Sequence, residues 1–568
     1  MITNAKLEWR CSVLALLLLV GSGQALGQTP AAKPATPHLE KRGSSTQLIV
    51  DGKPFLILGG ELHNSSSSSL VYMKPIWPRL AAMHLNTVLT PVAWETIEPE
   101  EGKFDFSIVD GLIQGARENN LRLLLLWFGS WKNTYSSYVP AWVKSNTERF
   151  PRVQTSDGRD TERLSPFSVT NRDADARAFA SLMRHLREFD GDAHTVIMVQ
   201  VENEVGVIPD SRDHSASANA AYSEAVPSDL TSYLQQHRAA LVPGFHAIWE
   251  GSGSKTSGSW EEMFGKSALT DDLFMSWYFA TYINHVAAAG KSEYSLPMYV
   301  NAALIRPNYQ PGQYNSGGPL PQSMDVWRAG GSAIDLLSPD IYFDEFAEWC
   351  QKYIRPGNPL FIPEARGGTD GAANAFYAFG QVSTIGFSPF GIDSEDTASA
   401  TATAGFGNTE RPRGAPIGYA YATLSRLMPL ILEKQTTGEI ASVVLEGEAQ
   451  RAARVTLGDY TMTVTRPANL TGDASAAAAR ASALFLQTGP NEYVVAGSGS
   501  AMVTFAASTP GLPIVGIESV DEEFFDGGQW VVGRRLNGDE NSQGQVLKLN
   551  ADDSARGRIY RVRLYRYR

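Results

Sequence analysis

The feature that most constrains this chain is a repeat of short apolar runs, separated by longer amphipathic stretches, between residues 55 and 390. A short apolar run is typical of a buried parallel strand, and a longer amphipathic stretch is typical of a helix. Their alternation indicates an α/β fold, and eight such units predict a (β/α)8 barrel, the TIM barrel. The eight strands are predicted at Phe55–Gly60, Thr87–Val92, Leu121–Trp127, Val196–Val201, Met298–Ala303, Leu336–Tyr342, Leu360–Pro363 and Gly386–Phe390.

One further strand-like run, Phe245–Glu250, lies between the fourth and fifth predicted strands, and we treat it as an insertion. If it were the fifth barrel strand instead, Glu364 would follow the eighth strand rather than the seventh. The next segment, Gly251–Thr256, superficially resembles a phosphate-binding loop. Ser254 stands where that motif requires a glycine before the lysine, so the match fails.

The sequence pattern changes after about residue 410. A last helix is predicted at Tyr419–Leu432, and segments of period two follow between turns rich in Gly, Asn and Asp. These segments include Tyr460–Thr465, Ala501–Phe505 and Ile559–Tyr567. We therefore expect the barrel at residues 45–410 and an all-β, β-sandwich-like domain at residues 411–568. Within it, the Ala-rich stretch Ala474–Ala483 is expected to form a loop or one short helix.

The first residues have the pattern of a secretory signal peptide. Lys6 and Arg10 precede the apolar run Val13–Val20, and Ala25-Leu26-Gly27 fits a small-residue cleavage site. The prediction is a signal peptide at 1–27, a flexible leader at 28–44, and export to the periplasm or the medium. A retained N-terminal anchor is the alternative, and no membrane span is expected after cleavage.

Charge and cysteine content exclude several classes of function. A formal net charge of −12 argues against a partner that is bound through its phosphates, so no nucleic acid is expected. The two cysteines are Cys11, inside the predicted signal peptide, and Cys350, which is expected to be a buried core thiol. We see no HExxH motif or Cys/His ligand spacing, so we expect neither a metal nor a cofactor.

Two predicted strands end in carboxylates. The fourth continues into Glu202-Asn203-Glu204, and the seventh continues into Glu364-Ala365-Arg366. The carboxyl ends of barrel strands meet at one face, so these groups are expected to lie close together. Two carboxyl groups roughly 5 Å apart are what hydrolysis of a glycosidic bond with retention requires.

The residues alone leave some choices open. Strand alternation sends Glu202 and Glu204 to the same side unless a bulge breaks the register, and either could be a solvated glutamate at a strand end. Arg366 is expected to hold Glu364 ionised, as a nucleophile must be, although the two could also form a purely structural ion pair.

The run Gln200-Val-Glu-Asn-Glu204 resembles the acid/base motif of glycoside hydrolase family 35, the β-galactosidases of a large clan of retaining (β/α)8 enzymes. Gly60-Glu61-Leu62-His63 and the segment from Trp94 to Phe106 are also similar to that family. The resemblance implies that Glu204 is the acid/base and Glu364 the nucleophile, with Glu202 supporting. It further implies that Asn203 bonds the sugar 2-hydroxyl and that Tyr342 bonds the nucleophile.

The loops that would hold the sugar depart from the pattern of the animal enzymes of the family. Pro91 and Glu95 replace a tyrosine and an asparagine, and the third-strand segment lacks an acidic residue, which points to a bacterial branch. Candidate sugar contacts are Glu61, His63, Trp127, Trp131, Lys132 and Asn133. Core positions remain the alternative for the two tryptophans.

The expected activity is therefore that of an exo-acting retaining β-galactosidase that releases terminal β-linked galactose from oligo- or polysaccharide side chains, with plant xyloglucan as one candidate. The alternatives are another exo-β-glycosidase, such as a β-arabinopyranosidase or β-glucosidase, and a non-catalytic carbohydrate-binding protein. The oligomeric state stays open, with a dimer as one option.

Overall fold

The computed structural model describes residues 35–395, 416–447, 449–467, 480–526, 529–550 and 557–568 of the chain. The predicted signal peptide and residues 28–34 of the leader lie outside this range, and so do residues 474–479 of the Ala-rich stretch. Among the described residues, no helix has both the length and the apolarity needed to cross a bilayer.

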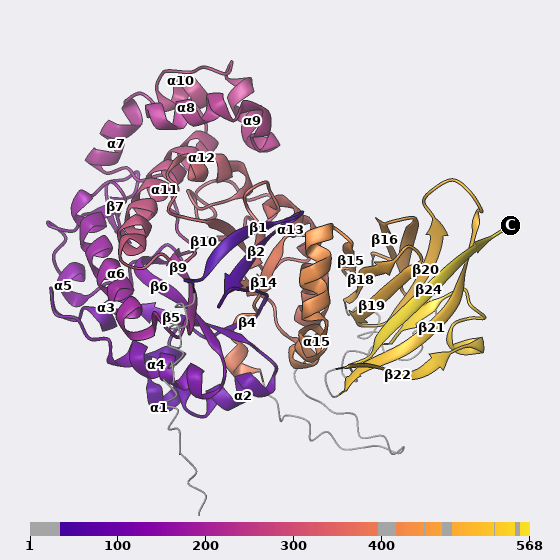
Figure 1. Cartoon of the computed structure of the whole chain (residues 1–568). Coiled ribbons are helices and arrows are strands. Elements are labelled where there is room, and N and C mark those ends of the chain that lie inside the picture. The colour runs from indigo at the N-terminus through magenta and orange to yellow at the C-terminus, as the bar shows by residue number, and fades with distance from the viewer. Residues whose placement is uncertain (1–34, 396–415, 448, 468–479, 527–528, 551–556) are drawn as a thin grey trace, which may run out of the picture. The chain divides into compact units, whose positions relative to one another are not determined.

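The prediction of an eight-stranded parallel barrel is confirmed (Figure 1). In the 9-stranded sheet, neighbouring strands pair in parallel, in the order β12-β14-β4-β5-β6-β9-β10-β11-β13. The strands are β4 (Ile57–Glu61), β5 (Thr87–Ala93), β6 (Arg122–Lys132), β9 (Val196–Asn203), β10 (Met298–Ala303), β11 (Leu336–Ile341), β12 (Leu360–Ile362), β13 (Glu364–Ala365) and β14 (Thr384–Phe387).

The count of nine arises because the seventh barrel strand is interrupted at Pro363. The segment before the proline, β12, pairs with β14, while β13 after it pairs with β11. Proline has no N–H to donate to a sheet ladder, so the strand changes partners there. The break brings Glu364 to the carboxyl end of the barrel, beside Asp340 of β11.

Helices surround the barrel strands (Figure 1). They are α1 (Leu70–Met73), α2 (Ile76–Ala82), α3 (Trp94–Ile97), α4 (Ser107–Glu118), α5 (Ala141–Lys144), α6 (Val169–Asp190), α7 (Ala216–Ser223), α8 (Ser228–Gln236), α9 (Pro243–Gly251), α10 (Trp260–Phe264), α11 (Ala268–Glu293), α12 (Met324–Ala329), α13 (Phe346–Tyr353), α14 (Gly368–Phe379) and α15 (Pro416–Thr437). A short hairpin, β7 (Arg152–Gln154) with β8 (Asp160–Leu164), precedes α6.

The run Phe245–Glu250 lies in an insertion, as predicted, but it is helical rather than strand-like. It falls within α9, which begins at Pro243. Phe245 and Trp249 are both buried and lie four residues apart, so they share one helix face. This periodicity, together with a proline in the first turn, is a helix signal that the apolar content obscured.

The folded structure begins earlier than the predicted boundary at residue 45. His38–Arg42 forms β1, which pairs in an antiparallel hairpin with β2 (Ser45–Val50), and β2 pairs in turn with β3 (Lys53–Phe55). Leu48 and Val50 pack in one cluster with inward-facing residues of the barrel strands. Residues 38–44 of the predicted flexible leader are therefore part of the fold, because the hairpin buries this apolar face.

The barrel also extends beyond residue 410. The last helix, α15, packs against α14, and the Tyr421 hydroxyl donates to the carbonyls of Gly59 and Phe387, at 2.7 and 2.8 Å. Since α15 follows the eighth strand and covers the barrel core, it completes the (β/α)8 pattern. The predicted boundary at 410/411 is therefore too early, and the barrel ends near Thr437.

The remaining residues form the expected all-β domain. Two antiparallel sheets, of six and four strands, enclose their own apolar core. The strands are β15 (Ile440–Leu445), β16 (Ala452–Leu457), β17 (Tyr460–Thr465), β18 (Ala481–Gly489), β19 (Glu492–Ser498), β20 (Ala501–Ala507), β21 (Ile514–Asp526), β22 (Gln529–Leu536), β23 (Leu547–Leu549) and β24 (Ile559–Tyr567). Cys350, in α13, is fully buried as predicted, and burial raises the pKa of its thiol.

Candidate active site

Three carboxylates meet at the carboxyl ends of the barrel strands. Glu204 directly follows β9, Glu364 begins β13, and Asp340 lies in β11 in register with Glu364. One oxygen of each carboxylate lies within 4.8 Å of the others. The structure thus brings together the two glutamates predicted from sequence and adds Asp340, which sequence reasoning missed.

A break in strand register separates Glu202 from Glu204. Both residues have positive φ, 63° and 46°, and the pairing of β6 with β9 shifts between Trp127 and Lys132. Glu202 accepts hydrogen bonds from the backbone N–H groups of Ser130 and Trp131, at 3.0 and 2.7 Å, and is buried. The bulge therefore leaves Glu204 beside Glu364, while Glu202 holds the end of β6.

Hydrogen bonds fix the orientation of Glu364. The Tyr342 hydroxyl donates to one carboxylate oxygen at 2.9 Å, and the Asn301 amide lies 3.4 Å from the other. The same amide donates to Asp340 at 2.7 Å. Arg366, which was expected to be the cation beside Glu364, instead binds Asp344 at 2.8 Å. That expectation is corrected by the structure, because the loop after β11 carries a competing carboxylate.

The cation that acts on the site is Lys132, at the end of β6. We call Glu61, Glu204, Asp340 and Glu364 the carboxylate cluster. Burial opposes the charge on Lys132, but the negative cluster raises its pKa above the ordinary value. Only 7% of Lys132 is exposed, so its charge is weakly screened by water.

The cluster contains two carboxyl groups whose pKa values are raised by their surroundings. Burial and the negative charge of Glu364 raise the pKa of Glu204 from 4.5 to about 7, while Lys132 and a hydrogen bond with Asp340 act in the opposite direction. Burial and the same Glu364 charge raise the pKa of Asp340 well above its ordinary value. Near neutral pH, Glu204 is therefore poised to give and take a proton.

In the described part of the chain, Glu61 is the member of the cluster that lacks hydrogen-bond partners. It ends β4, is fully buried, and neither oxygen of its carboxylate has a hydrogen-bond partner among the described residues. Burial and the Glu364 charge raise its pKa well above the ordinary value. A buried acceptor without a partner is costly, so it is a candidate for binding a ligand hydroxyl.

Asn133, directly after β6, and Asn203, at the end of β9, belong to a network of side-chain amides. The Asn203 side chain donates to Asn133 and accepts from Gln200, both at 3.1 Å. Its oxygen also lies 3.4 Å from the Asn301 amide. Asn203 is thereby held next to the residues that orient Glu364.

The two tryptophans do not line the site. The Trp127 indole N–H donates to Asp175 of α6, and that of Trp131 donates to the Leu164 carbonyl, at 2.9 and 3.0 Å. Both residues are at most 1% exposed. Their expected role as sugar contacts is corrected: they pack between the barrel and its helices, because the strand periodicity sends their side chains outward.

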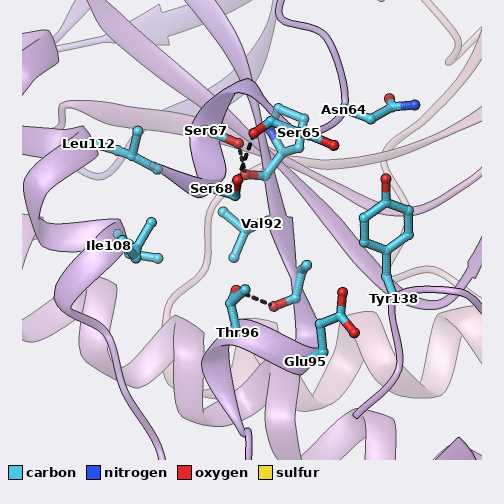
Figure 2. Close-up of a pocket in the computed structure, with 13 residues that line it drawn as sticks. Asn64, Ser65, Ser67, Ser68, Val92, Glu95, Thr96, Ile108, Leu112 and Tyr138 are labelled. Atoms are coloured by element: carbon cyan, nitrogen blue, oxygen red, sulfur yellow. Dashed lines mark hydrogen bonds between the residues drawn. The ribbon is translucent and has the colours of Figure 1, made fainter. Parts of the chain in front are cut away.

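His63 and the Ser-rich loop that follows it, Asn64–Ser69, form a separate region. The His63 ring bonds Asp393 at 2.9 Å, and with Ser65 and Tyr72 it lines a cavity that includes neither Glu204 nor Glu364. A further cavity of about 170 Å³ lies between the loop, β5 and α4 (Figure 2). There the Ser67 hydroxyl donates to the Pro91 carbonyl at 2.6 Å. The Ser67 hydroxyl thus attaches this loop to β5.

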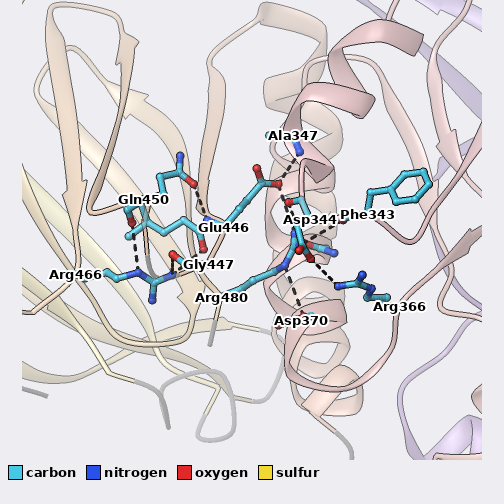
Figure 3. Close-up of polar contacts among 12 residues, drawn as sticks. Phe343, Asp344, Ala347, Arg366, Asp370, Glu446, Gly447, Gln450, Arg466 and Arg480 are labelled. Atoms are coloured by element: carbon cyan, nitrogen blue, oxygen red, sulfur yellow. Dashed lines mark hydrogen bonds and ion pairs between the residues drawn. The ribbon is translucent and has the colours of Figure 1, made fainter. Parts of the chain in front are cut away.

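The all-β domain reaches the loop that follows β11 (Figure 3). Arg480 is 4% exposed and donates to the carbonyls of Phe343 and Asp344, at 3.2 and 3.0 Å, and to the Asn374 side chain at 2.9 Å. It also contacts Glu446 at 3.4 Å. Since Tyr342 directly precedes these carbonyls, Arg480 anchors the segment that presents the tyrosine to Glu364.

The cluster is also where a cation would bind. Among the described residues, Glu204, Asp340 and Glu364 are the group whose carboxylates are close enough to share a metal ion. Lys132 already supplies positive charge to the same three groups.

The missed residues carried a usable signal. Asn301 and Asp340 are polar residues near the ends of otherwise apolar barrel strands, which is the rule that identified Glu204 and Glu364. Asn315, whose side chain donates to the Glu204 carbonyl at 3.0 Å, comes from a loop and had no such signal.

Two family models match the chain. Residues 74–263 match a glycoside hydrolase 42 model described as β-galactosidase. Residues 417–548 match a domain of unknown function. The chain is thus similar in sequence to β-galactosidases over residues 74–263, whereas family 35, which the motifs suggested, is not the family matched.

Individual relatives are similar over part of their length. A β-galactosidase of Xanthomonas manihotis is 31% identical over 217 residues, which is 37% of this chain and 33% of the relative. Beta-galactosidase 11 of Arabidopsis thaliana is 27% identical over 29% of this chain and 18% of its own. A solved β-galactosidase from Bacillus circulans sp. alkalophilus has a TM-score of 0.43 at 16% identity, covering 66% of this chain and 57% of that one. The chain thus spans about a third or less of the two curated relatives.

Proposed function

We propose that this chain is an exo-acting retaining β-galactosidase of the family 35 type, which releases terminal β-linked galactose from oligo- or polysaccharides. The observation that carries the proposal is the spacing of Glu204 and Glu364, which have carboxylate oxygens within 4.8 Å of each other. Retaining enzymes hold their two carboxyl groups about 5–5.5 Å apart, whereas inverting enzymes leave about 6.5–9.5 Å for a water.

The proposed reaction has two steps. Protonated Glu204 donates its proton to the glycosidic oxygen, while the Glu364 carboxylate, held by Tyr342 and Asn301, attacks the anomeric carbon. The aglycone leaves as an alcohol, and a glycosyl ester forms on Glu364. Glu204, now ionised, takes a proton from water, whose oxygen attacks the anomeric carbon and frees Glu364.

The remaining polar groups fit a sugar in the first position. The unpartnered Glu61 carboxylate accepts hydrogen bonds from sugar hydroxyls, and Asn203 bonds the 2-hydroxyl, where bonding strengthens in the transition state. Lys132 offsets the negative charge that these carboxylates bring. The choice of galactose is supported by the names of the relatives, and we further propose export to the periplasm or medium, which cell fractionation tests.

Azide distinguishes the two roles. With an activated nitrophenyl β-galactoside, Glu364→Ala opens space for azide on the nucleophile side and yields the α-galactosyl azide. Glu204→Ala still forms the glycosyl ester, which azide opens to the β-galactosyl azide. The same anomer from both variants would contradict the assignment. Nitrophenyl β-glucoside and β-arabinopyranoside in the same panel test the choice of sugar.

A further inference from the structure

Two adjoining cavities lead away from Glu204. The first, of about 390 Å³, is lined by Glu204, Asp340 and Tyr342 and by residues of the loop that follows β10. The second, of about 370 Å³, is lined by Trp349 of α13 and its neighbours. Both volumes lie within the range of small-ligand sites, about 300–1,000 Å³.

The two cavities share part of their lining. Arg306, Tyr309 and Phe343 line both of them, so they form one groove that starts at the candidate acid/base. Its walls come from the loop after β10 and from the segment between β11 and α13. These loops stand at the carboxyl face of the barrel, where substrates bind in this fold.

The groove has the chemical character of a sugar-binding surface. Tyr309 is 40% exposed and lies 6.0 Å from the Arg306 guanidinium, and the Lys352 ammonium lies 4.2 Å from the Trp349 ring. Aromatic rings pack on the C–H faces of pyranose rings, and the neighbouring charged groups bond hydroxyls at their edges. The buried Trp127 and Trp131, in contrast, are inaccessible to a sugar.

The position of the groove identifies which part of a substrate it holds. An acid/base protonates the oxygen of the leaving group, so the leaving group lies on its side of the scissile bond. Glu204 lines the groove, whereas Glu61, Asn203 and Lys132 do not. We propose that this groove binds the aglycone, and that the substrate is a β-galactosylated oligo- or polysaccharide with at least two sugar units behind the scissile bond.

This inference rests on the proposed function and adds the class of aglycone to it. The β domain takes part indirectly, because Arg480 bonds the carbonyl of Phe343, which stands where the two cavities meet. Contacts along the groove, rather than contacts with the galactose itself, would make the protein prefer a galactosylated polysaccharide to a simple galactoside.

The test compares two substrates in wild type and four variants of the full chain. The substrates are nitrophenyl β-galactoside, with one aglycone ring, and a galactosylated xyloglucan oligosaccharide, with several aglycone sugars. Tyr309→Ala and Trp349→Ala are expected to lower the ratio of kcat/KM, oligosaccharide over nitrophenyl galactoside, at least tenfold. Tyr565→Ala, which alters a tyrosine of β24 that is 46% exposed, is the matched control and should keep the wild-type ratio.

The outcomes separate the two proposals. If the ratio of kcat/KM values is unchanged in both Tyr309→Ala and Trp349→Ala, or falls equally in Tyr565→Ala, the proposal that the groove binds the aglycone is wrong. The assignment as a galactosidase would still stand. A wild-type protein that cleaves no β-galactoside overturns the proposed function itself. Tyr309→Phe keeps the ring and should retain most of the ratio, which guards against a loss caused by misfolding of the loop.

Discussion

Replacing Arg480 with methionine tests whether the β domain supports the active site. Methionine keeps much of the aliphatic length of arginine but removes every polar contact. Three hydrogen bonds of 2.9–3.2 Å are lost, to Asn374 and to the carbonyls of Phe343 and Asp344, and Glu446 loses its cation. Because Arg480 is 4% exposed, water does not readily replace these contacts.

The expected cost follows from this burial. Removing one partner of a buried ion pair costs about 3–5 kcal/mol, mostly because the other partner is left uncompensated. The Glu446 side chain is 15% exposed, so it is only partly relieved by solvent, and we expect about 3 kcal/mol. The freed carbonyls loosen the segment that positions Tyr342, and a small displacement of a positioning group lowers kcat/KM by roughly 10- to 100-fold.

The assay is denaturant unfolding followed by tryptophan fluorescence, together with kcat/KM on nitrophenyl β-galactoside. Arg159→Met is the control, because Arg159 pairs with Asp157 on the surface, with side chains 78% and 58% exposed. Surface pairs contribute little to stability, so this variant should resemble wild type. If Arg480→Met matched the control in both assays, the claim that Arg480 anchors the segment would be refuted.

Three further predictions concern the carboxylate cluster. The kcat/KM profile should fall about tenfold per pH unit above pH 7, because Glu204, whose pKa is about 7, must be protonated to act as the acid; a profile flat to pH 9 contradicts this. As the pH rises from 5 to 8, the free energy of unfolding of Asp340→Asn in urea should increase relative to that of wild type. The reason is that a carboxyl whose pKa is raised in the folded protein destabilises the folded state as it ionises. Parallel curves of unfolding free energy against pH for the two proteins would contradict this. Glu61→Gln should raise the urea midpoint of unfolding, because the Glu61 carboxylate has no hydrogen-bond partner without substrate, yet lower kcat/KM about 10- to 100-fold. A fall in both the midpoint and kcat/KM would show that Glu61 has a structural role.

The strands of the barrel could be predicted because each is a short apolar run with a distinct boundary. Met298–Ala303 coincides with β10, and Tyr460–Thr465 coincides with β17 in the β domain. The first hairpin was missed because His38–Arg42 is polar and mostly exposed, and pairing with β2 rather than periodicity makes it a strand. The helix at Phe245 was misassigned because a short apolar run does not by itself distinguish a strand from a buried helix.

A site residue could be predicted where it lies in the sequence at the end of a recognisable strand. Glu204 and Glu364 are of this kind, whereas the partner of Arg366 depended on Asp344, a residue from another loop. The exposure of Trp127 could not be predicted either, because a tryptophan at a strand end suits a sugar platform and a helix interface equally well. Long-range contacts of this type are fixed by tertiary packing, which one sequence does not reveal.

The most direct test of the central claim is covalent trapping of the nucleophile. A 2-deoxy-2-fluoro-β-galactosyl donor with an activated leaving group should form a glycosyl ester that turns over slowly, because fluorine destabilises the transition state of hydrolysis. Peptide mass spectrometry of the inactivated protein should place one fluorogalactosyl group on Glu364, with excess galactose protecting the protein. A label on Glu61, Asp340 or Glu204, or inactivation without any label, would contradict the account.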